Sequence, residues 1–118
     1  MDRELKVWGE RWLIRKDTTH AVSFLRVQEG YQCSWHKHQT KYNKFVVTRG
    51  RIIITVEELG EIQRVLLGPG EMFTTRPGQW HKFESYTGNA DYISEMIEEM
   101  YVEYDESDIE RKELGGKV

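Results

Sequence analysis

Short apolar runs alternate with glycine-bearing turns along most of the chain. The runs are rich in β-branched and aromatic residues and cover residues 21–27, 45–48, 51–56, 62–67 and 72–75. A glycine lies in the turn after each run, where it tolerates backbone dihedral angles that other residues avoid. Several short strands separated in this way predict an antiparallel β-sandwich or barrel.

The segment 92–104 fits two periodicities. Its apolar and aromatic residues recur at the spacing of one helical face: Ile93, Met96, Ile97, Met100, Tyr101 and Tyr104. Ile93, Ile97 and Tyr101 would also share one face of a strand. The pattern therefore leaves open both a strand and an amphipathic helix packed on a sheet. For the acidic tail that follows, residues 105–118, we expect a short helical turn or a disordered coil.

Length and charge limit the classes of protein to consider. With 118 residues and a mass of 14.1 kDa, the chain has the size of one domain. We expect a single domain over 1–118, with an N-terminal strand over 5–16, a core over about 20–104 and the acidic tail 105–118. The formal net charge of -3 lacks the basic excess that neutralises a phosphate backbone, so a nucleic-acid partner is not expected.

Cysteine usage and the first residues indicate the compartment. The single cysteine, Cys33, cannot form a disulfide within the chain, and the first residues lack the apolar stretch of a signal peptide. No apolar run approaches the ~18 residues of a membrane-spanning helix. We therefore expect a cytoplasmic protein with no membrane association.

The candidate chemistry lies in three histidines. His36 and His38 are two residues apart, so a strand would place both imidazoles on one face. Imidazole is a common ligand of first-row transition metals, and such a pair needs only one or two further donors from another strand. His81, which follows the turn at Pro77 and Gly78, is the third candidate.

These histidines belong to a longer spaced pattern. One part contains, at intervals of five, one, four and six residues, Gly30, His36, His38, Asn43 and Gly50. The other contains Gly70, Gly78 and His81. Together the two parts resemble the paired motifs of the cupin superfamily. Within this superfamily the chain is most similar to single-domain cupins that resemble the C-terminal domain of type II mannose-6-phosphate isomerase. This resemblance rests on Trp8-Gly9, residues 78–81 and residues 108–111.

The resemblance implies both a fold and a ligand set. The fold would be all-β, the cupin double-stranded β-helix or jelly-roll barrel, with a strand over 92–104. The metal ligands would be His36, where the isomerases often have glutamine, His38, His81 and Asn43. Asn43 stands where the family has a glutamate, and its amide offers a neutral oxygen. A divalent ion (Zn, Mn, Fe, Ni or Co) would then bind less tightly and act as a stronger Lewis acid.

The function that the resemblance implies is a metal-dependent isomerase acting on, or binding, a sugar or sugar phosphate, with aldose-ketose isomerisation as the reaction. Two alternatives stay open: a non-catalytic carbohydrate or small-ligand binding module, and an iron-dependent oxygenase or lyase. No general base emerges, because Lys82 and Lys44 are out of phase with the ligands and Glu84 only flanks His81. Four arginines are candidates for a phosphate group: Arg26, Arg49, Arg76 and Arg111.

Two further expectations concern aromatic residues and assembly. Five aromatic residues would line or underlie the cavity, most of them as plain core residues: Trp35, Trp80, Phe45, Phe73 and Phe83. Cupins commonly cover their edge strands by pairing, so we expect a homodimer formed through residues 6–14 or through the acidic tail.

Overall fold

The computed structural model describes residues 2–86 and 93–118, and these residues form strands joined by turns and loops, with no helix. The strands, in chain order, are β1 (Asp2–Lys6), β2 (Gly9–Lys16), β3 (His20–Gln28), β4 (Tyr31–Gln32), β5 (Trp35–Lys37), β6 (Tyr42–Arg49), β7 (Ile52–Glu58), β8 (Glu61–Leu67), β9 (Met72–Thr75), β10 (Trp80–Ser85), β11 (Ile93–Tyr101), β12 (Glu110–Glu113) and β13 (Gly116–Lys117). The five apolar runs lie in β3, β6, β7, β8 and β9, as expected.

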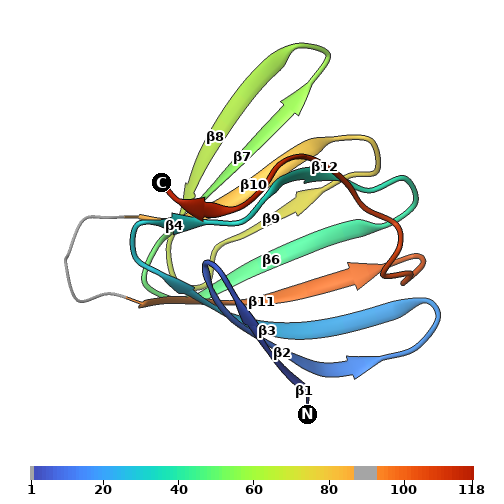
Figure 1. Ribbon diagram of the computed structural model, residues 1–118, viewed down its shortest axis with the longest axis horizontal. Coiled ribbons are helices and arrows are strands. Elements are labelled where there is room, and N and C mark those ends of the chain that lie inside the picture. The colour runs from blue at the N-terminus through green and yellow to red at the C-terminus, as the bar shows by residue number, and fades with distance from the viewer. Residues whose placement is uncertain (1, 87–92) are drawn as a thin grey trace.

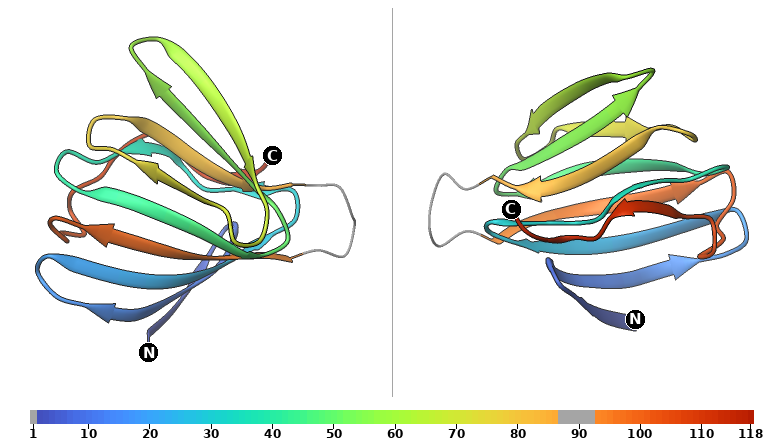
Figure 2. Two further views of the ribbon diagram at one scale, coloured as in Figure 1. Left: turned by 180° about the vertical axis from the view of Figure 1, so that it is seen from behind. Right: turned by 45° about the horizontal axis from the view of Figure 1, so that its top comes forward.

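The strands form two antiparallel sheets. One has the order β1-β2-β3-β11-β6-β9. The other has the order β12-β5-β10-β4-β13, with β7 paired to β10 and β8 paired to β7. The two sheets face each other as a jelly roll, and the β7–β8 hairpin extends away from the rest of the molecule (Figures 1 and 2). The all-β jelly-roll expectation is therefore confirmed.

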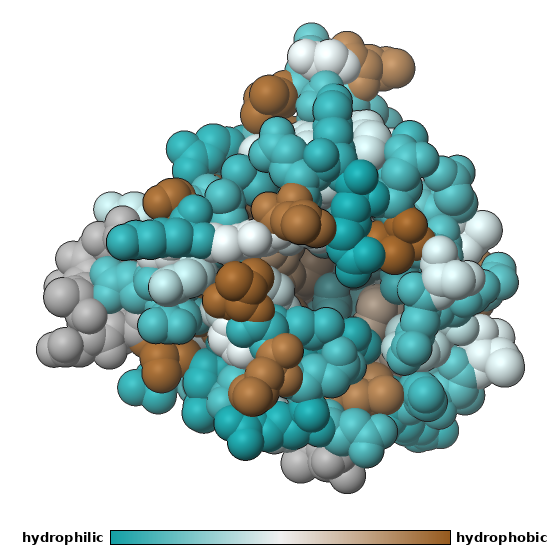
Figure 3. Space-filling model, in the orientation of Figure 1, coloured by the Kyte–Doolittle hydropathy of each residue, from teal (hydrophilic) through white to brown (hydrophobic). Residues whose placement is uncertain are grey.

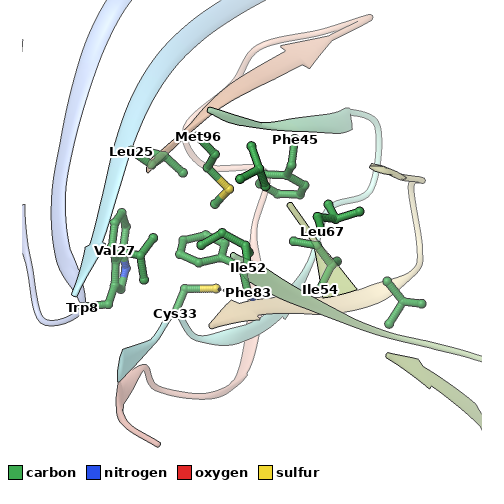
Figure 4. Packing of buried hydrophobic residues seen from close by; sticks show 12 residues of the cluster. Trp8, Leu25, Val27, Cys33, Phe45, Ile52, Ile54, Leu67, Phe83 and Met96 are labelled. Atoms are coloured by element: carbon green, nitrogen blue, oxygen red, sulfur yellow. Dashed lines mark hydrogen bonds between the residues drawn. The ribbon is translucent and has the colours of Figure 1, made fainter. Parts of the chain in front are cut away.

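The core lies between the sheets because each inner strand alternates buried and exposed residues. Figure 4 shows side chains from both sheets pointing toward one another. The largest fully buried apolar side chains are Leu25 and Val27 on β3, Phe45 and Val47 on β6, Ile52 and Ile54 on β7, and Met96 on β11. Each such side chain contributes roughly 1.5–3 kcal/mol through removal of apolar surface from water.

The 93–101 segment is a strand, which settles the ambiguity of the sequence pattern; Tyr92 lies outside the described residues. β11 is the centre of its sheet, with β3 on one side and β6 on the other. Ser94, Met96, Glu98 and Met100 point inward, whereas Ile93 is exposed (38%) and Ile97 is half-buried. Hydrogen bonding of β11 to a neighbour on both edges is consistent with a strand and not a helix here.

The N-terminal segment differs from the single strand expected over 5–16. It forms a hairpin of β1 and β2 that reverses at Val7 and Trp8. Gly9, which follows the turn, lets β2 lie close to β3: its φ is 149°, and a Cβ there would collide with the backbone carbonyl oxygen of Arg26.

The C-terminal tail is also different from its expectation. A helical turn or disordered coil is wrong, because β12 pairs with β5 and β13 pairs with β4. Gly115 allows this approach, since a Cβ there would lie 2.7 Å from the carbonyl oxygen of Gln32. The tail therefore completes the second sheet, an outcome of long-range pairing that its acidic composition conceals.

The five candidate aromatic residues separate into two groups. Phe45 and Phe83 are buried in the core, and Phe73 packs against it. Trp35 and Trp80 instead stack on each other, with ring centroids 6.4 Å apart, and their half-buried rings lie on the face opposite to the inward-pointing His36 and His81. The expectation of a cavity-lining role is therefore wrong for these two tryptophans. In the described ranges, no helix is long and apolar enough to cross a membrane.

Candidate metal centre

The three histidines of the sequence pattern meet inside the jelly roll. His36 lies on β5 and His81 lies directly opposite on the antiparallel neighbour β10, so their side chains share a face. His38 comes directly after the last residue of β5, two residues beyond His36. The ring centroids are 4.4 Å apart for His36 and His81, 5.1 Å for His36 and His38, and 5.2 Å for His38 and His81. One nitrogen from each ring lies within 4.8 Å of the others, so one ion can contact all three.

Hydrogen bonds to backbone carbonyls select the tautomer of each ring. Nδ1 of His36 lies 2.7 Å from the carbonyl oxygen of Ser34, Nδ1 of His38 lies 2.7 Å from that of Asp108, and Nδ1 of His81 lies 3.0 Å from that of Gln79. A carbonyl only accepts, so each Nδ1 donates its hydrogen and each neutral ring keeps the lone pair on Nε2.

The Nε2 atoms supply the test of whether a metal fits. Those of His38 and His81 are buried and have no hydrogen-bond partner in the described part of the chain. A buried acceptor without a donor is costly, and such atoms are rare in native proteins. A cation coordinated by these lone pairs satisfies both atoms at once, and the carbonyls behind the rings hold them in the ligating orientation.

Burial keeps the rings neutral, which metal binding requires. Desolvation, with the nearby His38 ring as the next cause, lowers the pKa of His36 to about 3. Desolvation, followed by the charge of Lys41, lowers the pKa of His38 to about 4. Desolvation and then His36 move the pKa of His81 well below its ordinary value. At neutral pH no proton competes for the three lone pairs.

Asn43 lies on β6, only 2% exposed, and its amide has two distinct ends. Nδ2 donates a hydrogen bond of 2.8 Å to Oε2 of Glu98 on the neighbouring strand β11. Oδ1 is buried and has no hydrogen-bond partner among the described residues. The carboxylate thus fixes the orientation of the amide and leaves its carbonyl oxygen as an unused donor of lone pairs.

A cavity of about 470 Å³ adjoins the cluster, and His36, His38 and Asn43 form part of its wall. Figure 3 shows a hollow near the middle of this face of the molecule. Its charged and polar wall includes Arg11, Lys41, Glu98, Tyr104 and Arg111. Phe83, alone of the five candidate aromatic residues, contributes to the lining.

Sequence reasoning missed Glu98 and Lys41. A signal for Glu98 was present, because the second alternating set of β11 carries this one charged residue between Met96 and Met100 on the face that the structure buries. Lys41 had no such signal. It lies in a loop just before β6, and only the folded chain shows that it is 6% exposed.

The other candidate residues from the sequence lie away from the cavity, with one exception. Lys82 donates to Gln32 outside the core, and Glu84 accepts from Arg64 at 3.1 Å. The candidate phosphate-binding arginines Arg26 and Arg49 form ion pairs with Glu95, and Arg76 pairs with Glu58. Arg111 is the exception, since it lines the cavity.

Asp108 ties the C-terminal tail to the loop that follows His38. Its carboxylate accepts hydrogen bonds from the backbone nitrogens of Gln39 (2.7 Å) and Thr40 (3.1 Å) and from the Thr40 hydroxyl (2.8 Å). Its carbonyl accepts from His38 Nδ1. These bonds favour the ionised carboxylate and keep the pKa of Asp108 below its ordinary value, although its partial burial opposes them. The tail therefore supports the candidate centre.

Comparisons with known proteins agree with this fold. Structures of CapF with the inhibitor 3-isopropenyl-tropolone (TM-score 0.80, 22% identity, 95% of this chain and 34% of that one) and of the capsular polysaccharide assembling protein CapF from Staphylococcus aureus (0.80, 21%, 95% and 31%) are similar. So is oxalate decarboxylase from Bacillus subtilis at pH 4.6 (0.78, 15%, 94% and 30%). The chain spans about a third of the length of these proteins, and at such identities the likeness concerns the fold.

Sequence comparisons complete the assignment. No curated protein matches the chain. The family model of the cupin domain matches residues 23–93, which include His36, His38, Asn43 and His81. Since this match covers more than half of the sequence and agrees with the jelly roll and its histidine cluster, the chain belongs to the cupin domain family.

Proposed function

We propose that this chain is a metal-binding cupin in which Nε2 of His36, His38 and His81 and Oδ1 of Asn43 hold one divalent transition-metal ion. The observation that carries the proposal concerns His38 and His81, whose buried Nε2 atoms have no hydrogen-bond partner among residues 2–86 and 93–118 and whose Nδ1 atoms are already engaged. Oδ1 of Asn43, which has no partner in the same residues, supports the proposal as the fourth donor. Zinc, manganese, iron, nickel and cobalt are the candidate ions.

The bound ion would supply Lewis acidity to an oxygen atom of a ligand held in the cavity. All four proposed donors are neutral, so they leave the charge of the ion uncompensated. Glu98 places a carboxylate behind Asn43 and partly offsets that charge through the amide. The chain thus separates two roles that one glutamate ligand combines: the amide supplies the donor oxygen, and the carboxylate behind it supplies the charge.

The ligand that we propose is a sugar or sugar phosphate. Support comes from the size and the polar wall of the cavity and from the motif likeness to the C-terminal domain of type II mannose-6-phosphate isomerase. One neighbouring fold belongs to a protein described as assembling capsular polysaccharide. Aldose-ketose isomerisation is the reaction to test, by the interconversion of mannose-6-phosphate and fructose-6-phosphate.

A non-catalytic binding module is the second candidate, and one observation favours it. Oε2 of the buried Glu98 carboxylate accepts a hydrogen bond of 2.8 Å from the Asn43 amide, so this carboxylate is directed toward Asn43 and keeps only Oε1 for a role as general base. Ligand binding without turnover by the metal-loaded protein would select this candidate over the isomerase.

Metal analysis of protein purified without a histidine tag tests the proposal. We expect one transition-metal ion per chain, removable by a chelator and restored by reloading. His81→Gln should lose this uptake, whereas His20→Gln, a change at a partly exposed imidazole that pairs with Glu99, should retain it. Wild-type protein that takes up none of the five candidate metals would refute the proposed centre.

We also propose a homodimer formed through the N-terminal hairpin. β1 is an edge strand of its sheet, and exposed apolar side chains gather on this hairpin: Leu5 (75% exposed), Val7 (60%) and Ile14 (48%). Apolar edge strands invite pairing with another chain. Sedimentation at micromolar concentration should give twice the mass of the chain, and Leu5→Lys should reduce it to the monomer mass. A monomeric wild type contradicts the proposal.

A further inference from the structure

Lys41 is a buried cation that forms no ion pair within the described part of the chain. Its side chain is only 6% exposed. In the described residues, the one hydrogen-bond acceptor of its Nζ is Sδ of Met100 at 3.5 Å, and no carboxylate forms an ion pair with it. A thioether sulfur is a weak acceptor, and the Tyr104 ring, with its centroid 5.5 Å away, adds only a cation–π contact. The ammonium group of Lys41 therefore has N–H donors available for a further partner.

Other basic side chains of the molecule show what a paired cation looks like here. Arg26 binds Glu95 at 2.9 Å and Arg64 binds Glu84 at 3.1 Å, both near the surface. Arg11, which shares the cavity wall with Lys41, donates to the Ser23 hydroxyl at 3.1 Å and to the Tyr104 hydroxyl at 3.3 Å. Lys41 is more buried than these residues and has weaker partners, although buried charges in proteins are normally paired.

The position of Lys41 relates this charge to the metal centre. It lines the same cavity as His36, His38 and Asn43. Burial lowers the pKa of Lys41, and the charges of Glu98 and Asp108 oppose this shift without a hydrogen bond to the ammonium group. A metal held by four neutral donors would add two positive charges beside the ammonium, and the carboxylate of Glu98 balances only part of that sum.

From this geometry, and building on the proposed metal function, we infer that Lys41 is the anchor for an anionic group, a carboxylate or a phosphate, of the small molecule that enters the cavity. The oxyanion accepts hydrogen bonds from the ammonium and neutralises the excess positive charge. Arg111, which lines the same cavity, adds to the attraction. The inference therefore favours an anionic ligand, either a phosphate ester such as the proposed sugar phosphate or an organic acid, over a neutral sugar.

Two substitutions of Lys41, one neutral and one basic, and a matched control at Lys44 test the inference. Lys41→Met keeps the length of the side chain and removes its charge, and Lys41→Arg keeps the charge. Lys44→Met makes the same change in net charge three residues away, on the face of β6 opposite to that of Asn43. Calorimetric titration of each metal-loaded protein uses inorganic phosphate, malonate and uncharged mannose, so that phosphate and carboxylate are tested separately.

We expect wild type to bind phosphate or malonate, and Lys41→Met to bind the same anion roughly 10- to 100-fold more weakly, which is the usual worth of a charged hydrogen bond. Lys41→Arg should keep most of the affinity, Lys44→Met all of it, and mannose binding should be the same in every variant. Without anion, Lys41→Met should also melt at a higher temperature than wild type, because a desolvated unpaired charge is gone.

Metal content, measured on the same samples, separates this inference from the proposed function. Metal-loaded wild type that binds neither anion, or Lys41→Met that binds the anion as tightly as wild type, overturns the inference and leaves the metal proposal standing. If no metal is taken up, the metal proposal fails, and the anion site is judged from the rise in melting temperature of the metal-free protein with phosphate or malonate. A rise in wild type that Lys41→Met lacks supports the site, and equal behaviour of the two overturns it. Should Lys41→Met not fold, Lys41→Gln replaces it in both arms.

Discussion

Acidification of the metal-free protein should destabilise its fold through the three clustered imidazoles. In the unfolded chain each histidine takes up a proton near pH 6.5. In the folded chain the pKa is about 3 for His36 and about 4 for His38, and that of His81 is shifted in the same direction, because burial disfavours the charged ring. Between these values the unfolded state binds more protons than the folded state.

The sign and the size of the effect follow from this difference. The free energy of unfolding that the neutral histidines contribute is fully present above pH 6.5. It is lost as the pH falls from there toward their folded-state pKa values. At pH 5, which is 1.5 pH units below the unfolded-state pKa, each of these histidines lowers the free energy of unfolding by about 2 kcal/mol, at 1.36 kcal/mol per unit. His36 and His38 together account for about 4 kcal/mol, and His81 adds to it. Small domains have only about 5–15 kcal/mol of total stability, so the loss is large.

Urea denaturation in the presence of a chelator at pH 7, 6 and 5 measures the effect. The loss of unfolding free energy between pH 7 and pH 5 should be smaller by about 2 kcal/mol in His36→Gln, which removes one of the clustered rings. The control His20→Gln keeps all three rings and therefore their full contribution. Equal losses in wild type and His36→Gln would refute the reasoning, because they would show that His36 stays accessible to protons in the folded state.

Three further predictions concern the surroundings of the centre and the packing of the N-terminal hairpin. Asn43→Glu should destabilise the metal-free protein by roughly 2–3 kcal/mol in urea denaturation, because two carboxylates then meet where the amide donated a hydrogen bond. Adding Glu98→Gln restores a donor and should recover most of the lost stability. Equal stabilities of the single and double variants would contradict the pairing of residues 43 and 98. Gly9→Ala should cost roughly 3 kcal/mol from backbone strain and steric collision, whereas Gly60→Ala, with positive φ but open space around it, should cost about 1 kcal/mol; similar losses would show that the collision is relieved elsewhere. Asp108→Ala should weaken metal binding roughly 10-fold in a chelator competition, because the loop after His38 loses its clamp; an unchanged affinity would mean that the His38 ring is held without it.

Local sequence patterns predict much of the fold of this protein. The strands of the core appear as apolar runs between glycines, because alternation and turn preference act over a few residues. The same local rule placed His36 and His38 on one side and made His81, after the Pro77-Gly78 turn, the third candidate, which the spacing of the cupin motifs then supported. All three converge in the structure as expected. The metal ligation itself, and Asn43 as the fourth donor, stay proposals.

The tertiary structure decided what depends on strands far apart along the chain. Glu98 meets Asn43 only because β11 pairs with β6, and only the fold shows that the inward face of β11 carries Met96 and Glu98. The tail became two strands by pairing with β4 and β5. The desolvation of Lys41 likewise exists only in the assembled cavity. Periodicity is a property of neighbouring residues, whereas burial, charge pairing and register are set by the whole sheet, so a single sequence indicates the first and leaves the others to the fold.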